Sequence, residues 1–121
     1  MYFKGNETIY SQLAEEIKKK IFSGVYVCGS RLPAIRDLAV EYRVNPNTIV
    51  RVYQELEEEG LVYTEGTSGK FVTKDETLAK KKKCEYVQNK ARRFAEEACG
   101  AGGGKEEALK YAAEAFLRRK D

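Results

Sequence analysis

The residues in this sequence best suited to chemistry are small amides, a hydroxyl and a guanidinium that cluster in one short stretch. Asn45, Asn47, Thr48 and Arg51 all fall within the segment NPNTIVR. At the start of a helix such groups can hydrogen-bond the edges of bases, and the free backbone N–H groups there attract phosphate. The alternative is that Asn45 and Pro46 only cap a helix, which leaves the other polar residues without a role. We therefore expect this stretch to contact nucleic acid.

Catalytic and metal-binding chemistry finds little support in the sequence. There is no histidine, and the three cysteines (Cys28, Cys84 and Cys99) lack the CxxC spacing of a metal site. No serine or cysteine has a nearby base, and no cluster of carboxylates suggests a metal. The segment GTSGK is not a phosphate-binding loop, because its spacing is too short and Phe71 follows the lysine. We predict that the protein is not an enzyme and that it needs no metal or cofactor.

Composition and cysteine content indicate a globular protein in a reducing compartment. The 121 residues are 42% hydrophobic and 34% charged, and an odd number of widely spaced cysteines does not make a disulfide framework. The N-terminal MYFKGNETIY lacks the apolar core of a signal peptide. No run approaches the ~18 apolar residues of a membrane span. We expect a cytoplasmic protein with no membrane partner.

Three helices and a hairpin must position the polar stretch, and each has a local signature. Gly24 ends the first helix, Pro33 opens the second, and Asn45 with Pro46 begins the third, which stops at Gly60. The apolar faces predicted for these helices are Ile9, Leu13, Ile17 and Ile21; Ile35, Leu38, Ala39 and Tyr42; and Ile49, Val52, Tyr53 and Leu56.

The segments between and after these helices have the character of strands and turns. The run VYVCGSRLP is β-prone and ends in turn residues. From Leu61 the hydrophobic period changes to two, and the segments LVYT and KFVT flank the glycine-rich loop EGTSG, which predicts a β-hairpin. Two short helices joined by a tight turn and followed by a hairpin form a winged helix-turn-helix. The sequence thus predicts a mostly α fold with a small β-hairpin, and we assign the winged helix-turn-helix to residues 1–75.

The remaining segment, 76–121, has a different character and a different charge. It holds 12 lysines and arginines against 8 acidic residues, whereas residues 1–75 hold 10 against 11. It contains two helical stretches separated by GAGGG, and each has a narrow apolar stripe of the kind that faces another helix. The stripe residues, predicted to form a dimer interface, are Cys84, Val87, Ala91, Phe94, Ala98, Leu109, Ala112 and Phe116. These stripes can be covered by each other, by the first domain or by a second copy of the chain.

The segments IYSQLAEEIKKKIFSG, RLPAIRDLAVEYRVNPNTIVRVYQELEEEGLV and GTSGKFV together resemble the GntR family of bacterial transcription regulators. The short helical C-terminal part is similar to the YtrA-like subfamily. The resemblance implies a homodimer on operator DNA, with the third helix in the major groove, the wing at the minor groove and a transporter operon as target. It also implies DNA-contacting roles for Arg36, Asn45, Asn47, Thr48 and Gly66. Four positions depart from the family: Val50 stands where arginine is common, and Glu65 stands where a basic or neutral wing residue is usual. Ala34 replaces a common helix-capping serine, and Cys28 replaces a common proline.

The predicted site combines these residues with plausible phosphate contacts. The DNA-contacting residues we predict are Tyr10, Arg31, Arg36, Asn45, Asn47, Thr48, Arg51, Gly66, Thr67, Ser68 and Lys70. For Tyr10, core packing is an equal alternative, and Arg36 could instead pair with Asp37, Glu41 or an acid on the third helix. The leading hypothesis is a homodimeric, sequence-specific repressor that binds an inverted repeat. The alternative is a winged-helix module that binds protein, and the sequence identifies no small-molecule effector.

Overall fold

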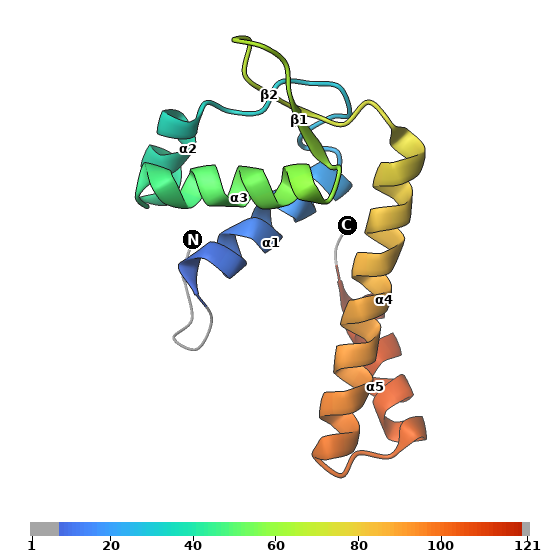
Figure 1. The fold of residues 1–121 in the computed structure, drawn as a ribbon. Coiled ribbons are helices and arrows are strands. Elements are labelled where there is room, and N and C mark those ends of the chain that lie inside the picture. The colour runs from blue at the N-terminus through green and yellow to red at the C-terminus, as the bar shows by residue number, and fades with distance from the viewer. Residues whose placement is uncertain (1–7, 120–121) are drawn as a thin grey trace. The chain divides into compact units, whose positions relative to one another are not determined.

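The computed structural model describes residues 8–119 (Figure 1). Its helices and strands are α1 (Ile9–Phe22), α2 (Ile35–Tyr42), α3 (Pro46–Glu58), β1 (Val62–Thr64), β2 (Lys70–Val72), α4 (Glu76–Gly100) and α5 (Lys105–Arg118). The chain forms two compact units, and the division between them falls inside α4, between Lys82 and Lys83. The segment MYFKGNETIY, which was predicted not to be a signal peptide, lies mostly outside the described residues. No helix in the described part is long and apolar enough to cross a bilayer.

Helix α3 begins and ends at the residues that the sequence suggested, whereas α2 begins at Ile35, with Ala34 as its N-cap and Pro33 just before the cap. The Asn45 side chain accepts a hydrogen bond from the Asn47 backbone N–H at 2.8 Å, and Pro46 occupies the first turn of α3. Arg43 adopts the left-handed conformation (φ 55°) that turns the chain between α2 and α3. After α3, Gly60 adopts φ 81°, a conformation that glycine reaches without steric cost. The predictions of an N-cap at Asn45 and of a stop at Gly60 are therefore confirmed.

The core of the first unit forms where α3 packs against α1 and α2 and is closed by the hairpin. Its fully buried side chains are Leu13, Ile17, Leu38, Ile49, Val52, Tyr53, Leu56, Leu61 and Val72. The predicted faces of α2 and α3 are confirmed, with Ile35 and Tyr42 partly buried. The prediction for Ile9 is wrong, because this residue is 48% exposed. Steps of four residues advance about 40° beyond a full turn, so Ile9 lies off the face and Tyr10 packs against the core instead.

The wing is an antiparallel pair in which Val62, Tyr63 and Thr64 face Val72, Phe71 and Lys70. Its loop closes through a bond from the Glu65 N–H to the Gly69 oxygen at 3.1 Å. The β-prone run at 25–33 does not form a strand of its own. It contributes one bridge, between Arg31 and Phe71, because its chain turns at Val27–Ser30 and leaves the valines of the run exposed.

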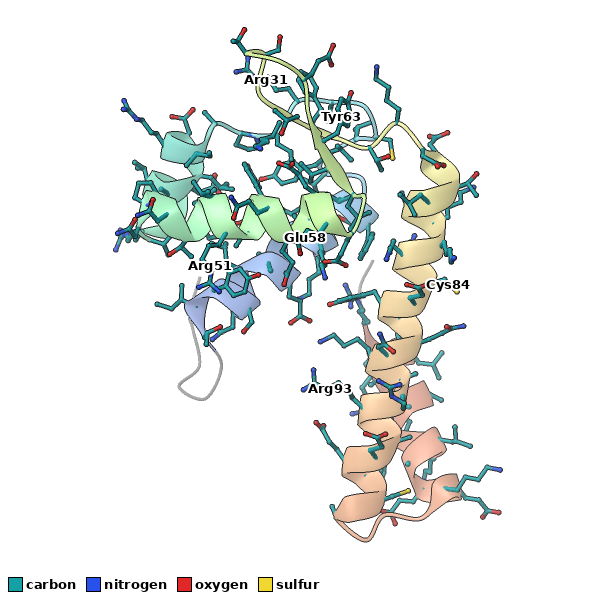
Figure 2. All side chains as sticks on the ribbon, viewed as in Figure 1. Arg31, Arg51, Glu58, Tyr63, Cys84 and Arg93 are labelled. Carbon is teal, nitrogen blue, oxygen red and sulfur yellow. The ribbon has the colours of Figure 1, made fainter. Side chains whose placement is uncertain are left out.

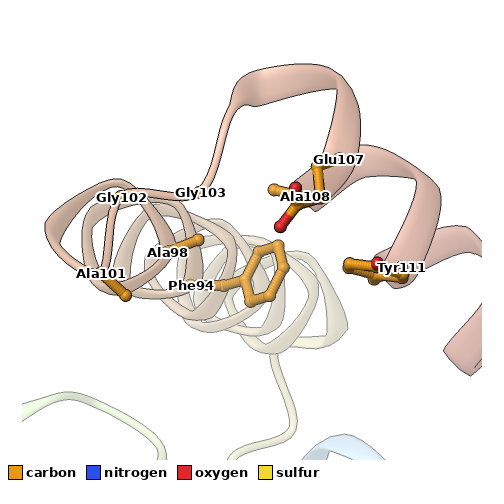
Figure 3. A pocket seen from close by; sticks show the side chains of 8 residues that line it. All are labelled: Phe94, Ala98, Ala101, Gly102, Gly103, Glu107, Ala108 and Tyr111. Carbon is orange, nitrogen blue, oxygen red and sulfur yellow. The ribbon is translucent and has the colours of Figure 1, made fainter.

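The second unit consists of the C-terminal part of α4, a glycine-rich turn and α5. A bond from the Gly103 N–H to the Ala98 oxygen at 2.9 Å closes the turn. The two helices meet around an open hollow of about 270 Å³, between Phe94 and Ala98 on α4 and Ala108 and Tyr111 on α5 (Figure 3). Neither helix has a buried residue in the part of the chain that the structure describes. The two stripes therefore do not bury each other within one chain.

Candidate nucleic-acid interface

The outward face of α3 carries polar residues because its apolar residues turn the other way. Ile49, Val52 and Leu56 are completely buried, which directs Asn47 and Arg51 outward. Thr48 lies on the flank and is half-buried. Gln54, which the sequence analysis did not select, is exposed on the same face, since it follows Asn47 by about two helical turns. The helical period alone could have identified it.

Arg51 lies over an aromatic ring from α1 (Figure 2). The centre of its guanidinium is 4.1 Å from the centroid of the Tyr10 ring. The Tyr10 hydroxyl donates a hydrogen bond to Glu55 Oε1 at 2.8 Å. Burial, and then this bond to Glu55, raise the pKa of the Tyr10 hydroxyl above its usual value, so the hydroxyl remains the donor. Tyr10 therefore contacts two residues of α3 at the same time.

Arg36, in the first turn of α2, is exposed and has no ion pair or hydrogen bond with any residue between 8 and 119. Glu41, one of the acids considered as its partner, lies 3.5 Å from Lys20 Nζ instead. Lys20 also donates to the Tyr42 hydroxyl at 2.7 Å, and this bond is the main cause that raises the pKa of Lys20. The guanidinium of Arg36 is consequently available to an external acceptor.

The Tyr53 side chain, on α3, holds the segment that precedes α2. Its hydroxyl donates to the Pro33 carbonyl oxygen at 2.8 Å, and burial raises the pKa of this hydroxyl, so it stays protonated. The bond holds the beginning of α2 at a defined place on α3. It therefore helps to determine where Arg36 stands relative to the polar face of α3.

Two of the cations predicted to contact DNA, Lys70 and Arg31, lie at the wing and are held differently. Lys70 Nζ forms an ion pair with Glu57 of α3 and donates to Thr64 Oγ1 at 2.7 Å. Arg31 is exposed and runs alongside the wing loop, where a β-carbon on Gly69 would lie 3.2 Å from Arg31 Nε (Figure 2). Gly69 has φ 110°, so a side chain there would be strained as well as crowded. The guanidinium of Arg31 therefore supplies the uncommitted positive charge at the wing.

These contacts pair several acidic residues of the first unit with lysines and leave its arginines without ion pairs among the described residues. Glu41, Glu57 and Glu59 are each paired with a lysine, the last with Lys18 at 2.8 Å. In contrast, Arg31, Arg36, Arg43 and Arg51 form no ion pair with any described residue. The residues at the tip of the wing, Glu65, Gly66, Thr67 and Ser68, are exposed. A unit of near-zero net charge thus presents unpaired guanidinium groups around α3.

The predicted dimer residues lie on an uncovered surface of the second unit. Those that are exposed are Cys84, Val87, Ala91, Phe94, Leu109 and Phe116, while Ala98 and Ala112 are half-buried. Within residues 8–119 no three metal-ligating side chains come together.

The sequence and the fold are similar to those of known bacterial regulatory proteins. Residues 9–72 match the model of "Bacterial regulatory proteins, gntR family". The HTH-type transcriptional regulator YhcF of Bacillus subtilis, itself uncharacterised, is 31% identical over 107 residues, which is 88% of each chain. The HTH-type transcriptional repressor YtrA of the same organism is 32% identical over 72 residues, 60% of this chain and 55% of that protein. A GntR family transcriptional regulator from Listeria monocytogenes has a similar solved structure, with a TM-score of 0.85, 31% identity and coverage of 93% of this chain and 98% of that one.

Proposed function

This chain belongs to the GntR family of bacterial regulatory proteins and is a sequence-specific DNA-binding transcriptional regulator, and from this premise we propose that it is a homodimeric repressor of an inverted-repeat operator. The observation that carries the proposal is the set of unpaired arginines around the exposed polar face of α3. Guanidinium groups that have no hydrogen-bond acceptor within the protein can neutralise phosphates or form bidentate hydrogen bonds with guanine. A transporter operon is our proposal for the target.

In the proposed complex α3 enters the major groove with its N-terminal half. Asn47, Thr48 and Arg51 face the base edges and the flanking phosphates, and Asn45 caps the helix at the same end. Arg36 approaches the groove from the first turn of α2. An exposed amide or guanidinium contact of this kind discriminates between base pairs by about 1–3 kcal/mol.

The wing then contacts the DNA backbone beside that groove. Gly66, Thr67 and Ser68 bring exposed backbone and hydroxyl groups to the tip, and Arg31 supplies the positive charge. Lys70, held by Glu57, has a structural role in this proposal and contributes less to DNA binding. Glu65 opposes the phosphates.

The second unit provides the two-fold interface of the proposed dimer. Large apolar side chains remain exposed on both of its helices, with Phe94 at 46% and Phe116 at 77%. A second copy of the chain, related by two-fold symmetry, would cover these stripes and bring two α3 helices to successive major grooves. Repression is supported by the similarity to YtrA, which is a repressor. The proposal places the protein in the cytoplasm, where its DNA target is found.

Selection of binding sites from random duplex DNA tests the proposal. We expect enrichment of an inverted repeat whose half-site centres are one or more helical turns apart. Affinity for the selected duplex should fall steeply with salt, as counterion release requires. A reporter gene behind the selected site should be less active when the protein is present. A protein that selects no sequence, or whose binding does not respond to salt, would leave the protein-interaction hypothesis as the better account.

The proposed dimer interface is tested separately by placing a negative charge in its apolar stripe. Phe94→Glu on the α4 stripe should shift the protein from dimer to monomer in sedimentation at micromolar concentration. Asn89→Glu, which is exposed on the opposite side of α4, is the matched control and should remain dimeric. A monomeric parent protein would refute the proposed interface.

A further inference from the structure

Arg51, Tyr10 and Glu55 form a closed set of contacts at the junction of α1 and α3. The Arg51 guanidinium lies over the Tyr10 ring, and the Tyr10 hydroxyl is bonded to Glu55. Arg51 and Glu55 are separated by four residues on α3, so both lie on the side of that helix that meets α1. The ring is thereby anchored at its hydroxyl end and presents one face to the guanidinium.

The start of α1, which carries Tyr10, is itself fixed. Thr8 caps the helix, and its Oγ1 accepts a bond from the Ser11 N–H at 3.0 Å. Tyr10 is half-buried and packs against the core, whereas Arg51 is exposed. The ring therefore belongs to the packed part of the unit, and the guanidinium that it supports is exposed.

The geometry of this contact leaves the recognition chemistry of Arg51 intact. The 4.1 Å distance to the ring centroid lets the flat face of the guanidinium lie on the ring, and its five N–H donors then point outward in the plane of the group. Arg51 has no hydrogen bond or ion pair with any residue from 8 to 119, so those donors are not consumed within the protein. A free arginine side chain loses considerable rotamer entropy when it is immobilised on a ligand, and a side chain already held on a ring loses less.

We propose that Tyr10 is a positioning residue for Arg51: the face of its ring, which packs against the core, holds the guanidinium in the direction in which it contacts DNA. In this role Tyr10 acts through Arg51 and does not itself bind phosphate. The inference rests on the proposed function, because the benefit of a pre-oriented guanidinium appears when DNA is bound.

The test is a double-mutant cycle on the full-length protein, with the duplex selected by the parent as the probe. Tyr10→Leu should weaken binding by about two- to fivefold per subunit, the range that a cation–π contact at an exposed site provides. In an Arg51→Ala background the same change should have almost no effect. Tyr10→Phe keeps the ring and should retain most of the affinity. The matched control is an Arg36→Ala background, where Tyr10→Leu should keep its full effect.

A second measurement follows the contact in the free protein. The ring current of Tyr10 should shift the side-chain resonances of Arg51 upfield in the parent and in Tyr10→Phe, and this shift should vanish in Tyr10→Leu. Since it requires no DNA, it distinguishes failure of the positioning from failure of the proposed function. A parent that binds no duplex would contradict the proposed function, whereas a missing ring-current shift would overturn the positioning by itself.

Three results in the binding experiment would overturn the inference while the regulator assignment stands. Tyr10→Leu could weaken binding equally in the parent and in Arg51→Ala, which would mean that Tyr10 acts on DNA directly or through the fold. Tyr10→Phe could be as weak as Tyr10→Leu, which would assign the effect to the hydroxyl. Arg51→Ala could bind as tightly as the parent, which would leave Tyr10 with nothing to position.

Discussion

Removal of one hydroxyl, in the variant Tyr53→Phe, tests how the DNA-binding elements are held together. The side chain is 1% exposed, and its hydroxyl donates to the Pro33 carbonyl oxygen at 2.8 Å. Phenylalanine fills the same space, so the change leaves no cavity and removes only the donor. A neutral hydrogen bond of this kind contributes about 0.5–1.5 kcal/mol to the free energy of unfolding. For a domain of 60–100 residues, each kcal/mol lowers the melting temperature by roughly 4–8 °C.

Tyr63 offers a matched control with the opposite expectation. Its hydroxyl is buried and has no hydrogen-bond partner among residues 8–119, while its ring stacks on Phe71 with centroids 5.6 Å apart. Tyr63→Phe deletes the same atom but relieves the cost of burying an unpartnered polar group. The free energy of unfolding should stay constant or rise by up to about 1 kcal/mol.

Thermal and urea denaturation of both variants, followed by circular dichroism, provide the comparison. The reasoning predicts a loss for Tyr53→Phe and no loss for Tyr63→Phe. If the two variants change stability by the same amount and in the same direction, the hydrogen-bond assignment does not govern these tyrosines and the argument is refuted. Tyr53→Phe should also weaken DNA binding slightly at temperatures where it is fully folded, because the beginning of α2 loses its tether to α3.

Four further substitutions test the roles of individual residues in DNA binding. Arg36→Ala should cost about 1–3 kcal/mol and relax the preference at one base pair per half-site if the guanidinium binds guanine; competition with single-base variants of the duplex measures this, and a uniform loss would indicate phosphate contact instead. Arg31→Ala should reduce the slope of log affinity against log salt by about one per subunit. Lys70→Met should leave that slope nearly unchanged and lower the melting temperature, because the ammonium is held by Glu57; equal slope changes in the two variants would contradict the assignment. Glu65→Gln should tighten binding to all duplexes, measured on selected and scrambled DNA, and weaker binding would show that the carboxylate has a structural partner.

The sequence by itself determined the fold class and the ends of α3. Helical period, the cap at Asn45, the proline after it and the stop at Gly60 are local signals, and each acts within a few residues of where it stands. The same is true of the change to a period of two that marks the hairpin. Family membership, too, could be inferred from the order of these segments. The one error on a helix face, Ile9, arose because a spacing of four drifts around a helix that repeats every 3.6 residues.

The availability of charged and polar groups was decided by the tertiary structure. The sequence offered Lys70 and Arg31 alike as DNA contacts, but Lys70 meets Glu57, which lies 13 residues away in the chain. It left open whether Tyr10 packs in the core or contacts phosphate, and the fold brings its hydroxyl to Glu55, 45 residues away, with the ring under Arg51. Such pairs form only when α1, α3 and the hairpin pack together, and no window of local sequence contains both partners. Packing therefore determines which of many charges remain free, whereas the local pattern determines where the helices and strands begin and end.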